Sequence, residues 1–233
     1  MGLPIFFDPY FYLVIIGIAI SGAASVYMQS TYSKFSDVKA SHGQTAAEVC
    51  RQILDSKGLS NIRLEGIRGE LTDHYSANEK TLRLSEATKN SDSVAAIGVA
   101  AHEAGHAIQD KEGYFPLRLR HLLVPVTNFG STLAWPVILF GLLIGQESGN
   151  FLIMLGIMLF SLALFFQLVT LPVEFNASRR AMKVLEGSAL LNEEELSQAR
   201  KVLRAAALTY VAATITTFLN ILRVFLLTQN RRR

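Results

Sequence analysis

The chain has 233 residues, of which 50% are hydrophobic, and its formal net charge is +3. Its mean hydropathy of +0.30 is too apolar for an average soluble domain and predicts membrane spans joined to a polar part. The single cysteine, Cys50, excludes an intramolecular disulfide and a metal site built from several cysteines, so a bound metal must be held by histidine and carboxylate side chains.

Four apolar segments approach or exceed the ~20 residues that a helix needs to cross a bilayer. They cover residues 10–28, 122–145, 151–171 and 205–227, and Arg223 interrupts the last of them. The first segment lacks the basic start of a signal peptide, and its apolar run is longer than such a peptide needs. We therefore expect the first segment to remain as an uncleaved anchor.

The polar region between the first two apolar segments predicts two helices separated by short strands. Residues 45–59 have helical periodicity. Residues 62–85 alternate between apolar and polar side chains, with a hairpin turn inside the run. Residues 90–110 predict a second helix, which Ser91 or Ser93 caps.

This second helix contains the sequence HEAGH, in which His102 and His106 are four residues apart. Residues at that spacing lie on one helix face, so both imidazoles can reach one cation. Glu103 is one step round the helix, where it can hold a water molecule without being a ligand, as in the HExxH motif of zinc peptidases. The five-residue pattern also occurs by chance. Here two features favour a zinc site over a chance match. The motif follows a predicted hairpin, and it contains Gly105, which destabilises a helix by about 1 kcal/mol relative to alanine and therefore indicates close packing.

A catalytic zinc ion usually has three protein ligands, so a third ligand is expected elsewhere. Asp110 and Glu112 are too close in sequence to the histidines to turn back onto the same metal. Glu174 directly follows the third apolar segment. Two crossings of the membrane would return the chain to the side of the motif and bring Glu174 with it. The alternative is an interfacial carboxylate paired with Arg179 or Arg180.

Three segments, "AAHEAGHAIQ", "LTDHY…TLRLSE" and "LPVEFNASRRA", together resemble the YugP-like family of bacterial neutral zinc membrane metallopeptidases. The layout is also similar to that of HtpX-type and CAAX-prenyl membrane endopeptidases. Those proteins have an aspartate four residues after the glutamate, where this chain has Ser178, which can form one hydrogen bond to a zinc-binding histidine. The resemblance implies that His102, His106 and Glu174 bind one Zn²⁺ per chain and that Glu103 is the catalytic base.

The expected fold is a mainly α membrane protein, with a zincin-like catalytic domain that contains a small β-hairpin or sheet and is joined to about four transmembrane helices. Pro172 predicts a helix boundary after the third apolar segment. The expected organisation is an N-terminal anchor (1–28), a catalytic region with the HExxH helix (29–121), a transmembrane hairpin (122–171), a helical segment with the third ligand (172–204), and a C-terminal apolar helix with a basic tail (205–233).

The distribution of basic residues predicts which side of the membrane carries the motif. Residues 1–9 and 146–150 contain no lysine or arginine. The motif side carries, close to the apolar segments, Lys34, Lys39, Lys111, Arg118, Arg120, Arg179, Arg180, Lys183, Arg200, Lys201 and Arg204. We therefore expect an integral protein of a bacterial-type cell membrane with its catalytic side in the cytoplasm. The C-terminal arginines disagree if the last segment crosses, so either the rule is overridden there or the last helix starts in the polar part and does not cross.

The expected function is a membrane-embedded zinc endopeptidase that hydrolyses peptide bonds with metal-activated water and Glu103 as general base. Its expected partners are protein or peptide substrates, membrane proteins among them, and the lipid bilayer, but not nucleic acid. An edge strand around residues 71–75 would align the substrate, and His74 or Tyr75 are candidates for stabilising the oxyanion.

Two alternatives belong to other functional classes. A non-catalytic membrane scaffold or adaptor could retain the metal site, but it would not need Glu103. A metal transporter is disfavoured because the apolar segments contain almost no ionisable residues. Zinc is inferred from the types of ligand, and Mn²⁺ or Co²⁺ would fit the same donors.

Overall fold

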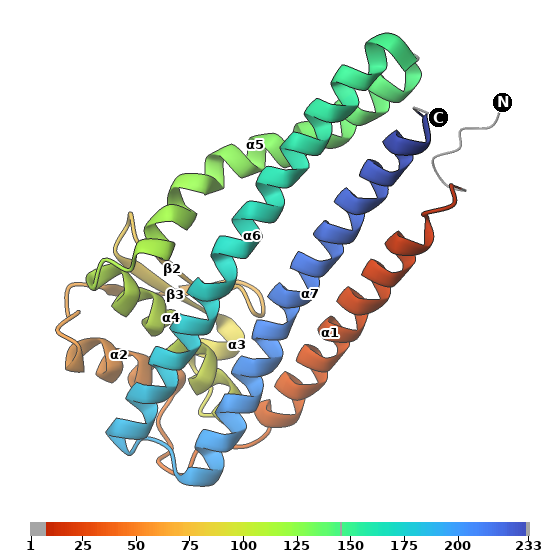
Figure 1. Cartoon of the computed structure of the whole chain (residues 1–233). Coiled ribbons are helices and arrows are strands. Elements are labelled where there is room, and N and C mark those ends of the chain that lie inside the picture. Colours follow the sequence, from red (N-terminus) through yellow and green to blue (C-terminus); the bar gives the residue numbers. More distant parts are fainter. Residues whose placement is uncertain (1–7, 145, 232–233) are drawn as a thin grey trace. The chain divides into compact units, whose positions relative to one another are not determined.

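The computed structural model describes residues 8–144 and 146–231, so residues 1–7 of the expected anchor and 232–233 of the expected tail lie outside it. The described chain forms two compact units (Figure 1). The apolar unit contains the chain up to Ser25, Leu119–Leu171 and the chain from Thr209, whereas the polar unit contains Val26–Arg118 and Pro172–Leu208. The elements are α1 (Tyr12–Ser36), α2 (Ala46–Ser56), β1 (Arg63–Ile67), β2 (His74–Ser76), β3 (Thr81–Ser85), α3 (Glu86–Lys89), α4 (Val94–Lys111), α5 (Phe115–Leu143), α6 (Gln146–Ser188) and α7 (Glu193–Arg231).

Four helices of the described chain, α1, α5, α6 and α7, are long and apolar enough to cross a membrane. Large apolar side chains in these helices are exposed, for example Ile18, Phe129 and Phe151 at 65%, 68% and 72%. An exposed apolar surface of this kind suits a lipid environment. The predicted fold class, mainly helical with a small sheet and about four transmembrane helices, is confirmed.

Helices α1 and α7 pack against each other in opposite directions inside the apolar unit (Figure 1). The hydroxyl of Thr216 on α7 donates to the carbonyl oxygen of Gly17 at 2.9 Å and lies 2.8 Å from the Ser21 hydroxyl. Farther along α7, the guanidinium of Arg223 meets the carboxylate of Asp8 at 2.5 Å. Both members of this ion pair are buried, so Arg223 has the partner that a charge within an apolar segment requires.

The polar unit contains a three-stranded sheet in the order β1-β3-β2. β3 is its central strand, parallel to β1 and antiparallel to β2, so β2 forms an edge of the sheet. The predicted hairpin is confirmed as β2 and β3. Leu82 and Leu84 of β3 are fully buried, in one core with apolar side chains of α2 and α4. Helix α4 begins where the sequence predicted, because the side chain of Ser93 accepts a hydrogen bond from the Ala96 N–H.

The predicted helix boundary at Pro172 is wrong, because α6 continues through this residue to Ser188. A proline removes one backbone hydrogen bond and usually kinks or breaks a helix. Helices that cross membranes tolerate proline better, because neighbouring helices and polar side chains satisfy the freed groups. As a result, Glu174 lies inside a continuous helix and not at the start of a new one.

Helix α4 touches α6 backbone to backbone within the polar unit. A Cβ atom added at Gly105 would lie 2.5 Å from the carbonyl oxygen of Ala177, which is closer than real atoms approach. A Cβ added at Gly98 would lie 3.6 Å from the Cβ of Ala199, an ordinary contact. The two glycines of α4 therefore differ: Gly105 is needed for close packing, and Gly98 has space for a methyl group.

We predict that Gly105→Ala destabilises the protein by about 1–3 kcal/mol, because α6 must move away from α4. The matched variant Gly98→Ala should be neutral or up to about 1 kcal/mol more stable, because alanine is the better helix former. Thermal unfolding of both proteins in the same detergent measures the difference. A Gly105→Ala protein as stable as Gly98→Ala would contradict the packing described here.

Candidate metal centre

Two helices of the polar unit bring three metal-binding side chains together. His102 and His106 come from α4, and Glu174 comes from α6. The Oε2 atom of Glu174 lies 3.1 Å from Nε2 of His102 and 3.5 Å from Nε2 of His106. The ligand atoms of the three residues all lie within 4.8 Å of one another, and Glu174 is 1% exposed. Among the described residues, these three form the group that could hold a metal ion.

The second nitrogen of each imidazole is held by another polar side chain. Nδ1 of His102 lies 3.1 Å from the hydroxyl of Ser178, and Nδ1 of His106 lies 3.0 Å from Oε1 of Gln109. Such contacts fix the orientation of a metal-binding imidazole and decide which of its nitrogens carries the proton. Ser178 is therefore located where the sequence suggested, beside a histidine of the motif.

Gln109 determines which nitrogen of the neutral His106 imidazole carries the proton. Its amide nitrogen donates to the carbonyl oxygen of Val173 at 2.8 Å and to the side-chain oxygen of Asn176 at 2.9 Å. Its oxygen must therefore face His106 and accept the Nδ1 proton. In the neutral imidazole, the Nε2 atom of His106 then presents a lone pair toward the carboxylate of Glu174. A cation between these two acceptors would stabilise them in their buried place, so these residues fit a metal ion.

Glu103 lies beside this centre and is 9% exposed. Burial raises the pKa of its carboxyl group to about 7, although the charge of His102 acts in the opposite direction. The carboxylates of Glu174 and Asp73 raise this pKa further, and a hydrogen bond from the backbone of Tyr75 lowers it. Glu103 can therefore exist in both protonation states near neutral pH, as proton transfer requires.

Strand β2 runs next to Glu103, and no other strand of the described chain pairs with its outer edge. Because the Tyr75 backbone bonds Glu103, its N–H points away from β3, and its C=O must point to the same edge. The Tyr75 hydroxyl donates to the Asp110 carboxylate at 2.7 Å. Burial and this carboxylate raise the pKa of Tyr75, so its hydroxyl stays protonated.

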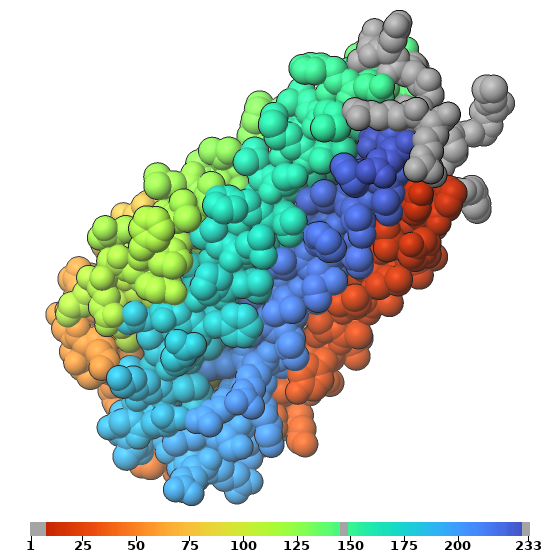
Figure 2. Space-filling view, viewed as in Figure 1, coloured from red at the N-terminus to blue at the C-terminus, as the bar shows by residue number. Residues whose placement is uncertain are grey.

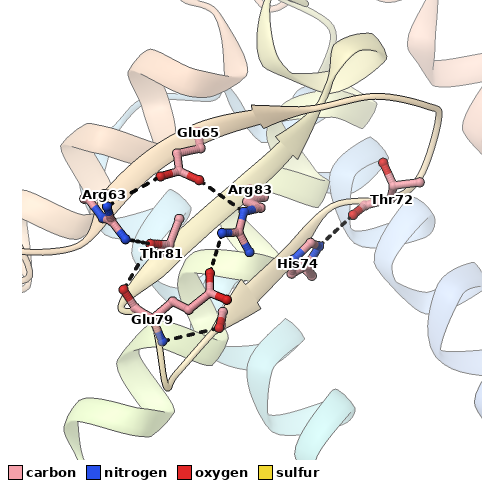
Figure 3. A network of polar contacts seen from close by, with 8 residues as sticks. Arg63, Glu65, Thr72, His74, Glu79, Thr81 and Arg83 are labelled. Carbon is pink, nitrogen blue, oxygen red and sulfur yellow. Dashed lines mark hydrogen bonds and ion pairs between the residues drawn. The ribbon is translucent and has the colours of Figure 1, made fainter.

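His74 lies on the other face of β2, because neighbouring side chains of a strand alternate. Its Nδ1 atom contacts the carbonyl oxygen of Thr72 at 2.9 Å. Figure 3 shows His74 near Arg83, whose guanidinium binds the carboxylates of Glu65 and Glu79. The fold thus brings the backbone of Tyr75 to the centre and directs the side chain of His74 elsewhere.

The other acidic residues near the motif have different partners. Asp110 accepts hydrogen bonds from Tyr75 and, at 2.6 Å, from Lys80. Glu112 pairs with Arg180, whose guanidinium also donates to Asn176 at 2.6 Å. These contacts agree with the expectation that neither acid turns back onto the metal.

Sequence reasoning missed Gln109, although it is fully buried. A signal was present: Gln109 is three residues after His106 and seven after His102, so it shares their helix face. A long polar side chain on the buried face of an apolar helix requires hydrogen-bond partners.

Comparisons with known proteins identify the family of the chain. Residues 10–229 match the model of the family described as "Putative neutral zinc metallopeptidase". The chain is 45% identical over 223 residues to "Putative membrane protease YugP" of Bacillus subtilis (strain 168), a match that covers 96% of this chain and 98% of the relative. No solved structure matches the chain. The chain belongs to the neutral zinc metallopeptidase family, and the resemblance seen in the sequence is confirmed.

Family membership identifies Zn²⁺ as the cofactor. The donor set of two imidazoles and one carboxylate suits this ion, and catalytic zinc sites use three such ligands. The similarity to a membrane protease and the four apolar helices of the described chain identify it as a membrane protein.

We predict that Gln109→Leu weakens zinc binding by about 10- to 100-fold, because the imidazole of His106 loses the acceptor that orients it. Competition with a fluorescent zinc chelator measures the affinity. The control Gln52→Leu makes the same substitution at an exposed position of α2 and should bind zinc like the unmodified protein. Equal affinities in both variants would exclude an orienting role for Gln109.

Proposed function

We propose that the protein is a membrane-embedded zinc endopeptidase of the HExxH…E type. His102, His106 and Glu174 are the zinc ligands, and Glu103 is the general base. The observation that carries this proposal is the convergence of two imidazoles and one carboxylate from two helices beside a second carboxyl group, that of Glu103, with a pKa of about 7.

The proposed mechanism assigns proton transfer to Glu103. When bound, zinc polarises the scissile carbonyl and lowers the pKa of water toward ~7. The Glu103 carboxylate accepts the proton of the attacking water and then delivers it to the nitrogen of the leaving amine. Ser178 and Gln109 hold the two imidazoles in place through their Nδ1 atoms.

The free edge of β2 is the proposed binding site for the substrate backbone. An extended peptide can add to an exposed sheet edge through main-chain hydrogen bonds. The C=O group of Tyr75 lies on that edge, and the N–H group of Tyr75 donates to Glu103. A peptide paired with β2 would therefore lie next to the proposed base. For His74, whose side chain occupies the other face of β2, we propose no role in stabilising an oxyanion.

A metal-retaining scaffold is the second candidate function. It would explain the two histidines and Glu174, but it would not explain a buried glutamate with a raised pKa next to the metal, because a scaffold needs no general base. The two candidates differ in one measurable property, the chelator-sensitive cleavage of an unfolded protein.

We predict that Glu103→Gln folds and binds zinc but cleaves unfolded casein at least about 100-fold more slowly, because general acid–base catalysis contributes about 10²–10⁴-fold. Glu86→Gln makes the same change at an exposed position and should retain full activity. A chelator should abolish cleavage by the unmodified protein.

The variant Glu174→Ala distinguishes the loss of a zinc ligand from the loss of the general base. This variant should lose zinc as well as cleavage, because only two protein ligands remain. Near-normal cleavage by Glu103→Gln would contradict the assignment of Glu103 as the base. No cleavage by the unmodified protein with bound zinc would favour the scaffold.

We also propose that the catalytic side faces the cytoplasm, on the basis of the lysine and arginine distribution. A cysteine introduced within residues 146–150 should react with a membrane-impermeant thiol reagent on intact cells. A cysteine at Asn78 in the β2–β3 turn should react only after permeabilisation. Both tests use the Cys50→Ala background, and the reverse labelling pattern would place the catalytic side outside.

A further inference from the structure

A groove with a volume of about 670 Å³ lies between α6 and α7 within the polar unit. Its floor is apolar and includes the buried side chains of Met182, Leu203 and Ala207. Figure 2 shows the surfaces of α6 and α7 next to each other in the lower part of the view. An apolar floor of this size can hold part of a hydrocarbon chain.

The rim of the groove is strongly basic. Arg179 and Lys183 on α6 are four residues apart, as are Arg200 and Arg204 on α7, so each pair lies on one helix face. Glu186 is the acidic residue of the lining, and it pairs with Arg200. Arg179, Lys183 and Arg204 are exposed, and within the described part of the chain none of the three forms an ion pair of this kind. The rim therefore suits an anionic group.

The groove adjoins the apolar segments of both helices in the sequence. On α6 its lining begins at Phe175, four residues after the end of the apolar unit at Leu171. On α7 it ends at Leu208, directly before the apolar unit resumes at Thr209. Phe175 and Leu208 lie within about a helical turn of an apolar segment and therefore at the level of lipid headgroups. Arg204 lies five residues before Thr209, and Arg179 and Lys183 lie eight and twelve residues after Leu171, so the basic rim extends from the headgroup level toward the polar unit.

The groove lies behind the metal centre and not over it. Ser178 lines the groove, and its hydroxyl meets Nδ1 of His102. The Nε2 atom of the same imidazole faces Glu174, and the free edge of β2 runs beside Glu103. A peptide that reacts at the metal must approach the Nε2 atoms, so the position of the groove favours a lipid over a substrate peptide.

We propose that this groove is a binding site for one anionic phospholipid. Arg179, Lys183 and Arg204 bind the phosphate group, and the first part of an acyl chain covers the apolar floor around Met182 and Leu203. Basic pockets that adjoin transmembrane helices recognise anionic headgroups in this way, and each Lys or Arg near the headgroup adds to the affinity.

Native mass spectrometry of the delipidated, full-length protein in detergent tests the proposal without reference to proteolysis. The protein is titrated with dioleoyl phosphatidylglycerol and, separately, with dioleoyl phosphatidylcholine. We expect one phosphatidylglycerol per chain, bound at least about tenfold more tightly than phosphatidylcholine. The triple variant Arg179→Gln/Lys183→Gln/Arg204→Gln, which keeps the Arg200–Glu186 pair, should lose this preference.

A matched variant, Lys57→Gln/Arg63→Gln/Arg68→Gln, removes the same charge from exposed positions outside the groove and should keep the preference. Equal affinity for the two lipids, or an unchanged preference in the groove variant, would overturn the proposal. Glycerol phosphate that competes as well as the lipid would show that the apolar floor is not used, and this too would overturn it. Displacement of the lipid by an oligoglutamate peptide would instead identify a peptide site.

Discussion

The backbone contact between α4 and α6 is the constraint on which the metal centre depends. The two histidines are on one helix and the third donor is on another, so all three meet only if the helices touch. The missing side chain at Gly105 allows the carbonyl of Ala177 to approach α4. Ala177 lies between Glu174 and Ser178 in α6, so one contact positions both the carboxylate of the centre and the hydroxyl that holds His102.

The polar residues around the centre form a connected set rather than isolated pairs. Gln109 bonds His106, the Val173 carbonyl and Asn176, and therefore links the imidazole on α4 to the backbone and side chains of α6. Because each buried polar atom in this set has a specific partner, the imidazoles have little freedom to rotate. A centre of this kind is oriented before the metal binds, and the metal in turn stabilises the folded state by mass action.

The acidic residues next to the centre form hydrogen bonds and ion pairs with other side chains, and this limits the negative charge at the centre. Asp110 is occupied by Tyr75 and Lys80, and Glu112 by Arg180. Among the described residues, Glu103 and Glu174 are then the ones that bring carboxyl groups to the imidazoles. Their environments differ, because Glu174 faces both imidazoles, whereas Glu103 is buried against the edge of β2. This difference supports the proposed division of roles, in which Glu174 binds the metal and Glu103 carries a proton at neutral pH.

The sequence by itself determined the features that depend on local spacing. The four-residue interval places His102 and His106 on one helix face, apolar length identifies the membrane helices, and alternation identifies the hairpin. Glu174 could be selected because counting membrane crossings returns it to the side of the motif. Tertiary structure alone decided that α6 continues through Pro172, that His74 faces away from the centre, and that Gln109 orients His106. These outcomes depend on which distant groups satisfy a buried polar atom or a freed carbonyl, and the period and spacing of one segment do not specify those partners.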